Sequence, residues 1–116
     1  MNARQNLLVV YTGRLAECRA FYTGLGLDLR PEQHGAGPRH YAAVLADGTV
    51  FELYPARPGR ETGALRLGFT LPGPANERRL LEDPDGRTVE LHVVVQEPEA
   101  EGDAGATSPE APPPAG

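Results

Sequence analysis

The chain is poor in several residue types and patterns that would narrow its class at once. It has one cysteine, Cys18, and no tryptophan. A single cysteine excludes an intramolecular disulfide and a zinc site built from cysteines. No apolar run reaches membrane-spanning length, and the amino terminus lacks the pattern of a secretory signal peptide. We therefore expect no membrane partner and a cytoplasmic location.

Basic residues do not exceed acidic ones in the chain as a whole. The chain carries 16 acidic and 11 basic residues, a net charge of -5. Residues 96–116 hold five of the acids and five prolines but no base and no large apolar side chain, which predicts a disordered acidic, proline-rich tail. The folded body, residues 1–95, is then neutral, with 11 acids and 11 bases. A neutral body offers no basic surface for nucleic acid.

One turn and the strand after it carry the most informative pattern. Residues 83–86 read Asp-Pro-Asp-Gly, which favours a tight turn. From residue 88 to 95 nearly every position is β-branched or apolar, and Glu90 and His92 fall together on one face of this strand. A solvated face is the common explanation for such residues. A second strand, residues 49–54, repeats the design with Glu52 and Tyr54 on one face.

The rest of the body alternates between two periods. Apolar residues recur every three to four positions from Leu15 to Leu25, which predicts an amphipathic helix ended by Gly24 and Gly26. Further strands are expected at residues 6–12, 29–33, 40–45 and 65–71, and a short one near Leu80. A proline- and glycine-rich linker, residues 55–63, separates an order β-α-β-β-β from an order β-β-β.

Four segments together resemble the vicinal oxygen chelate superfamily, which includes glyoxalase I, bleomycin-resistance proteins, fosfomycin-resistance enzymes and extradiol dioxygenases. They read RLAECRAFYTGLGL, FELYP, LRLGFTL and EDPDGRTVEL. The resemblance implies an α+β fold of paired β-α-β-β-β modules whose strands curl into a cup. Here the second module is shortened, because eight residues without helical character stand where the family has a helix and a strand.

In metal-using members the ligands come from four positions of the cup. The resemblance places these positions on Leu7, Glu52, Arg66 and Glu90. Leu7 has no donor atom and Arg66 is cationic. The sequence therefore predicts no cofactor and disfavours a divalent metal, and it leans against an enzyme. Two alternatives remain for Arg66: it replaces the metal by pairing with both Glu52 and Glu90, or its side chain extends into solvent.

The same comparison suggests which residues contact a ligand and how the protein associates. The predicted ligand-binding residues are Tyr11, Glu52, Tyr54, Arg66, Glu90 and His92. His34 and His40 are expected to be solvated. The missing helix would leave the apolar face of residues 65–71 uncovered, which predicts a homodimer.

Three functions from different classes remain open. The first is metal-independent binding of a small organic molecule in the cup, as in the bleomycin-binding branch of the superfamily. The second is a divalent-metal-dependent lyase, isomerase or dioxygenase. The third is a degenerate, non-catalytic subunit or interaction module. The two missing metal ligands favour the first and third.

Overall fold

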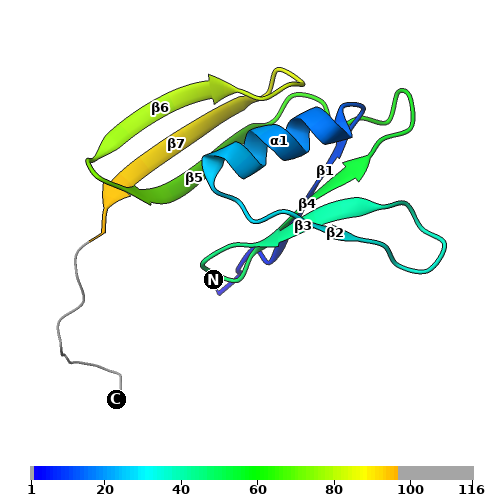
Figure 1. Ribbon diagram of the computed structural model, residues 1–116, viewed down its shortest axis with the longest axis horizontal. Coiled ribbons are helices and arrows are strands. Elements are labelled where there is room, and N and C mark those ends of the chain that lie inside the picture. The colour runs from blue at the N-terminus through cyan, green and yellow to red at the C-terminus, as the bar shows by residue number, and fades with distance from the viewer. Residues whose placement is uncertain (1, 97–116) are drawn as a thin grey trace, which may run out of the picture. The chain divides into compact units, whose positions relative to one another are not determined.

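The apolar and alternating segments form seven strands and one helix in the computed structural model, which describes residues 2–96. In chain order these are β1 (Leu7–Thr12), α1 (Leu15–Leu25), β2 (Arg30–Glu32), β3 (His40–Val44), β4 (Val50–Pro55), β5 (Arg66–Gly73), β6 (Glu77–Glu82) and β7 (Thr88–Val95) (Figure 1). The expected order β-α-β-β-β followed by β-β-β is confirmed. The predicted tail, apart from Gln96, lies outside the described residues.

The strands form two open sheets. The first has the order β1-β4-β3-β2, with β1 parallel to β4 and the other neighbours antiparallel. The second has the order β5-β7-β6. This is one module with a helix and one without, so the α+β fold with a shortened second half is confirmed. Among residues 2–96 no helix is long and apolar enough to cross a membrane.

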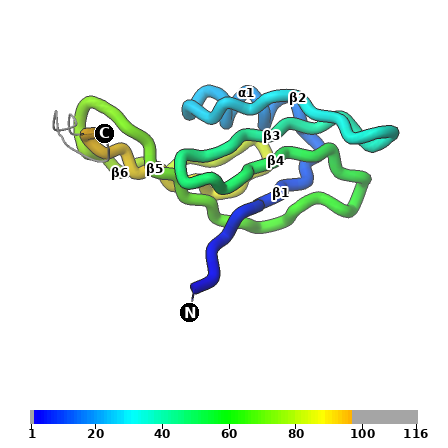
Figure 2. The backbone as a smooth tube through the Cα atoms, turned by 90° about the horizontal axis from the view of Figure 1, so that it is seen from below, coloured from blue at the N-terminus to red at the C-terminus, as the bar shows by residue number. Residues whose placement is uncertain are grey.

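Helix α1 covers one face of the four-stranded sheet, as Figure 2 shows. Its Tyr22 is fully buried and contacts the rings of Phe51 on β4 and Phe69 on β5, with centroids 5.1 and 6.1 Å apart. Strand β4 buries Phe51 and Leu53, and β7 buries Val89 and Leu91. The apolar core thus contains side chains from the helix and from strands of both sheets.

This core corrects the expectation that the missing helix leaves residues 65–71 uncovered. Leu67 is buried within the single chain, and Phe69 packs edge-to-face on Phe51. Leu65, Phe69 and Leu71 of this face are half-buried. The helix of the first module supplies much of the cover that the second module lacks.

Glycine and proline end these elements at slightly different places from those expected. Helix α1 continues through Gly24 and ends at Gly26, whose φ of 115° is left-handed and whose N–H bonds to the Thr23 carbonyl. Strand β5 continues through Pro72 and Gly73, two residues beyond its predicted end at Leu71. The Asp83–Gly86 turn forms as expected, with Gly86 at φ 85° and its N–H bonded to the Asp83 carbonyl.

By its contacts the chain divides into two units. The first comprises Met1–Phe69 with Arg78–His92, and it contains every site described below. The second comprises Thr70–Glu77 with the segment that begins at Val93. In the second unit the Asn76 side-chain oxygen accepts the Val95 N–H at 2.8 Å, and Gly73 lies so close to Val93 that a side chain would not fit there.

Candidate functional site

One row of side chains crosses the four-stranded sheet on the face opposite α1. Tyr11 of β1 is paired in register with Tyr54 of β4, and their ring centroids are 5.7 Å apart. Tyr54 stacks on His40 of β3, with centroids 4.0 Å apart and planes 11° from parallel. His40 is in turn the register partner of Glu32 on β2. Because cross-strand neighbours share a face, residues from all four strands meet in this row.

A pocket of about 660 Å³ opens beside the two tyrosines. It is lined by Tyr11, Pro38, Tyr54, Pro55, Arg57, Pro58 and Arg60. The loop that carries Arg57 and Arg60 is held to β1, because Tyr11 and Thr62 exchange two hydrogen bonds of 2.9 Å. Rigid aromatic and proline walls with two nearby guanidinium groups suit a flat molecule that carries negative charge.

Glu52 lies on the same face as Tyr54, two residues earlier on β4, and is half-buried. Loss of solvent around the phenol, followed by the charge of Glu52, raises the pKa of Tyr54. Leu7 also lies on this face, since it pairs with Val50, and it is 49% exposed. Two of the four positions that the resemblance matched to metal ligands therefore lie on this sheet. Glu52 offers a carboxylate there, and Leu7 offers only a hydrocarbon side chain.

The other two positions lie on the three-stranded sheet. The Glu90 carboxylate accepts hydrogen bonds from Arg78 at 2.5 Å, His92 at 2.9 Å and Arg66 at 3.2 Å. These donors, Arg78 first, lower the pKa of Glu90 from its ordinary value of 4.5 to about 2. Glu90 is thus already neutralised by protein cations. Leu7, Glu52, Arg66 and Glu90 do not form a donor set that fits a divalent metal.

The predicted bridge from Arg66 to both carboxylates is found only in part. Arg66 pairs with Glu90, but within residues 2–96 no ion pair joins it to Glu52. The predicted ligand-binding residues therefore fall into two groups, Tyr11, Glu52 and Tyr54 on one sheet and Arg66, Glu90 and His92 on the other. Arg78, which the sequence analysis missed, makes the shortest contact with Glu90. Two adjacent arginines occur in the ERRLLE segment of β6, and the sequence does not indicate which of them points toward Glu90.

The expectation of a solvated histidine holds for His34 and is wrong for His40. The His34 side chain is 74% exposed, whereas that of His40 is 1% exposed. His40 is buried because Tyr54 covers its ring and Glu32 lies against its edge. The alternation of the HYAAV segment puts His40 and Ala42 on one face, but only the register with β4 brings Tyr54 over the ring.

A buried polar network holds the turn before β7 and is structural. Asp83 accepts hydrogen bonds from the Tyr22 hydroxyl at 2.7 Å and the Arg87 guanidinium at 2.8 Å, and from the backbone N–H groups of Asp85 and Arg87. Burial opposes ionisation, but these donors outweigh it and lower the pKa of Asp83. Cys18 is fully buried, and burial raises the pKa of its thiol, which does not favour a nucleophile.

Comparison with known proteins supports the fold and leaves the activity open. No protein-family model and no curated protein sequence matches the chain. Among solved structures, an antibiotic-binding protein, TnmS3 from Streptomyces sp. CB03234, is similar over 79% of this chain and 96% of its own, with 21% identity and a TM-score of 0.56. A glyoxalase/dioxygenase from Nostoc punctiforme covers 80% and 92%, with 19% identity and a TM-score of 0.57.

A third structure, the oxidase ChaP-H2, covers 80% of this chain and 94% of its own, with 15% identity and a TM-score of 0.53. These neighbours share the glyoxalase, bleomycin-resistance and dioxygenase type of fold. The predicted resemblance is therefore confirmed: the chain has the fold of the vicinal oxygen chelate superfamily. The neighbours include binding proteins and enzymes by description, so the fold alone assigns no activity.

Proposed function

We propose that the protein binds a small, flat, anionic organic molecule in the pocket beside Tyr11 and Tyr54, without a metal at the four ligand positions of the family. The observation that carries this proposal is the pocket itself, in which two tyrosine rings stand next to Arg57 and Arg60. Stacking on the rings would supply apolar contact, and the guanidinium groups would bind a carboxylate or phenolate. The description of TnmS3 as an antibiotic-binding protein supports this class of function.

The experiment is a melting-temperature survey of the full chain with planar aromatic carboxylates, such as salicylate and naphthoates. A ligand that binds only the folded state at 100 times its Kd stabilises that state by about 2.7 kcal/mol. The best ligand should lose affinity in Tyr54→Ala and in Arg57→Gln. Tyr41→Ala is the matched control, because Tyr41 lies on the opposite face of the sheet under Arg19. Equal loss in the control, or no ligand at all, would contradict the proposal.

The predicted homodimer is also part of this proposal, although its basis has changed. With Leu67 covered inside the chain, the remaining exposed large apolar residues include Leu80 on β6 and Val94 and Val95 on β7. Exposed leucine and valine side chains on strands favour burial against a partner chain. Light scattering should give twice the chain mass at micromolar concentration, and a Leu80→Glu variant should reduce it. The cytoplasmic location stays a prediction.

A further inference from the structure

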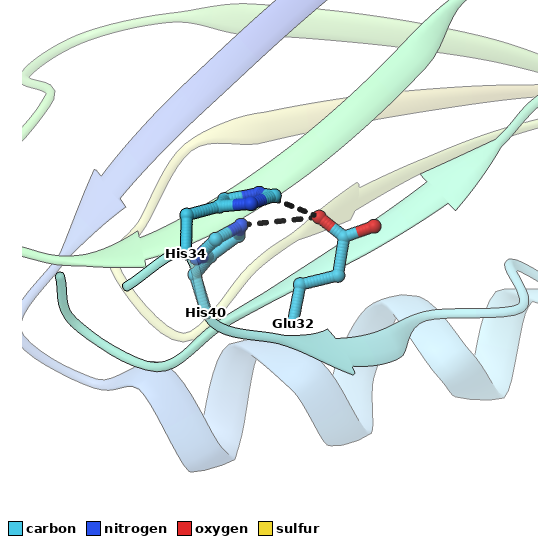
Figure 3. Close-up of side chains that lie close together, drawn as sticks. All are labelled: Glu32, His34 and His40. Atoms are coloured by element: carbon cyan, nitrogen blue, oxygen red, sulfur yellow. Dashed lines mark hydrogen bonds and ion pairs between the residues drawn. The ribbon is translucent and has the colours of Figure 1, made fainter. Parts of the chain in front are cut away.

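The row across the four-stranded sheet ends in a cluster that the small-molecule pocket does not explain. Glu32 of β2, His34 of the following loop and His40 of β3 direct their side chains toward one point (Figure 3). One ligand atom from each residue lies within 4.8 Å of the other two. Two imidazole nitrogens and a carboxylate oxygen are a donor set that zinc and related divalent ions accept.

The spacing of these atoms suits a common centre. Glu32 Oε1 lies 3.2 Å from His40 Nε2 and 3.5 Å from His34 Nε2. Ligands held about 2.0–2.2 Å from a tetrahedral ion lie roughly 3.3–3.6 Å from one another, so both separations are close to those of a metal's ligand shell. Small rotations of the exposed Glu32 and His34 side chains are enough to complete the geometry.

The second nitrogen of His40 fixes which atom faces the cluster. His40 Nδ1 lies 3.2 Å from the Pro38 carbonyl oxygen, which can only accept a hydrogen bond. With the ring proton on Nδ1 and bonded to Pro38, the lone pair of Nε2 would be available to an ion held between Nε2 and the Glu32 carboxylate. A ligating histidine is commonly oriented by such a bond from its other nitrogen to a backbone carbonyl.

A simple ion pair accounts for only half of the cluster. If His40 were protonated on both nitrogens, Glu32 and His40 would form a salt bridge without any ion. His34 approaches the same carboxylate oxygen, however, and its ring centroid is 5.2 Å from that of His40. One carboxylate offsets one imidazolium, whereas one divalent ion binds both neutral rings and the carboxylate together.

We propose that Glu32, His34 and His40 bind one divalent transition-metal ion, of the Zn²⁺, Co²⁺ or Ni²⁺ type, on the β2–β3 hairpin. The site stands apart from the positions at which the family holds its metal. Three protein ligands leave a fourth position open, on the side where Glu32 and His34 are exposed. The ion would tie the hairpin together and fix His40 against Tyr54, a wall of the pocket. The inference does not depend on the proposed function, because the ion is tested alone.

The test is a Co²⁺ titration of the full chain, prepared without a histidine tag and freed of metal with a chelator. We expect the visible absorption of tetrahedral Co²⁺ to saturate at one ion per chain, and Zn²⁺ to displace it. Glu32→Gln and His34→Ala should each weaken binding by at least about tenfold, the loss typical even of outer-shell changes. Both residues are exposed, so these variants keep the fold. His40→Ala is unsuitable as the main variant, since it removes a buried ring.

His92→Ala is the matched control. His92 is also a half-exposed histidine next to a glutamate, Glu90, but no second histidine joins that pair within residues 2–96. Its Co²⁺ affinity should equal that of the wild type. The proposal is overturned if the wild type gives no tetrahedral Co²⁺ spectrum, if Glu32→Gln and His34→Ala bind as tightly as the wild type, or if His92→Ala loses as much affinity as they do.

Discussion

Two carboxylate–arginine clusters lie close together in the sequence of the last two strands, one in the turn before β7 and one around Glu90 on β7. They differ in how far their side chains are exposed to solvent. In the first, the side chains of Asp83 and Arg87 are at most 2% exposed. In the second, Glu90 is bound by Arg66 and Arg78, whose side chains are 62% and 57% exposed. The same chemical groups therefore serve different ends. The buried pair holds the turn before β7, and the exposed cluster surrounds Glu90, which the sequence resemblance matched to a metal-ligand position.

The buried pair is more than one salt bridge. The Arg87 guanidinium also reaches Asp85 at 2.9 Å and donates to the backbone carbonyls of Tyr11 and Thr62. It thus connects the turn before β7 to β1 and to the loop that borders the pocket. Removal of either charge would leave the other buried and deprived of its closest counter-ion. Such an uncompensated buried charge is among the most destabilising of single changes.

Asp83→Ala should have the largest effect on stability. It removes the more deeply buried of the two carboxylates that pair with Arg87, and with it the acceptor for two backbone N–H groups, so we expect a loss of about 3–5 kcal/mol in the free energy of unfolding. Urea denaturation measures this loss. Asp47→Ala is the control, because Asp47 caps the exposed turn at Thr49 by a similar backbone bond of 2.9 Å. Equal losses in the two variants would show that the burial and pairing of Asp83 add nothing to stability beyond a backbone cap.

Tyr22→Phe should have the next largest effect. The ring stays in the core, but the hydroxyl that donates to Asp83 at 2.7 Å is lost. Removal of a buried donor from a charged acceptor should cost about 1–3 kcal/mol. Tyr41→Phe is the matched control, since no hydrogen bond of the Tyr41 hydroxyl is found within residues 2–96. Urea denaturation midpoints of both variants measure the difference. If Tyr22→Phe is as stable as Tyr41→Phe, the hydrogen bond from Tyr22 to Asp83 does not contribute to stability.

Much of this fold followed from local patterns, and the outcome at particular residues shows why. The alternation in residues 88–95 predicted that Val89, Leu91, Val93 and Val95 face the core, away from Glu90 and His92. Val89 and Leu91 are buried as predicted, whereas Val93 is half-buried and Val95 is exposed. The Asp-Pro-Asp-Gly turn was equally readable, because proline and glycine restrict the backbone directly. These features depend on residues next to one another in the chain.

The site was less predictable because it depends on register between distant strands. Arg78 meets Glu90 only because β6 begins at Glu77, whereas the sequence suggested a strand near Leu80. His40 is buried only because β3 and β4 align it with Tyr54. Glu52 and Glu90, which alternate alike in the sequence, lie on different sheets. A pattern within one strand gives the face of a residue but not its partner across the sheet.

Acid should reveal a smaller difference, at Glu90 itself. A carboxyl group whose pKa is lowered in the folded state stabilises the protein above its unfolded pKa, and this contribution is lost as the pH falls through the folded value. For Glu90 the window runs from about 4.5 to about 2. Urea midpoints of the wild type should fall across this window. Those of Glu90→Gln should fall less steeply, and an unchanged slope would contradict the role of the exposed cluster.

The smallest expected effect separates the two exposed arginines. Arg78 is the larger cause of the lowered pKa of Glu90, and Arg66 follows His92. Carbon-detected NMR titration should therefore show that Arg78→Gln raises the pKa of Glu90 more than Arg66→Gln does. Both variants should unfold at nearly the wild-type urea concentration, because exposed ion pairs add little to stability. If Arg66→Gln had the larger effect on the pKa, Arg66 rather than Arg78 would be the main counter-ion, and its place at the family's ligand position would matter electrostatically.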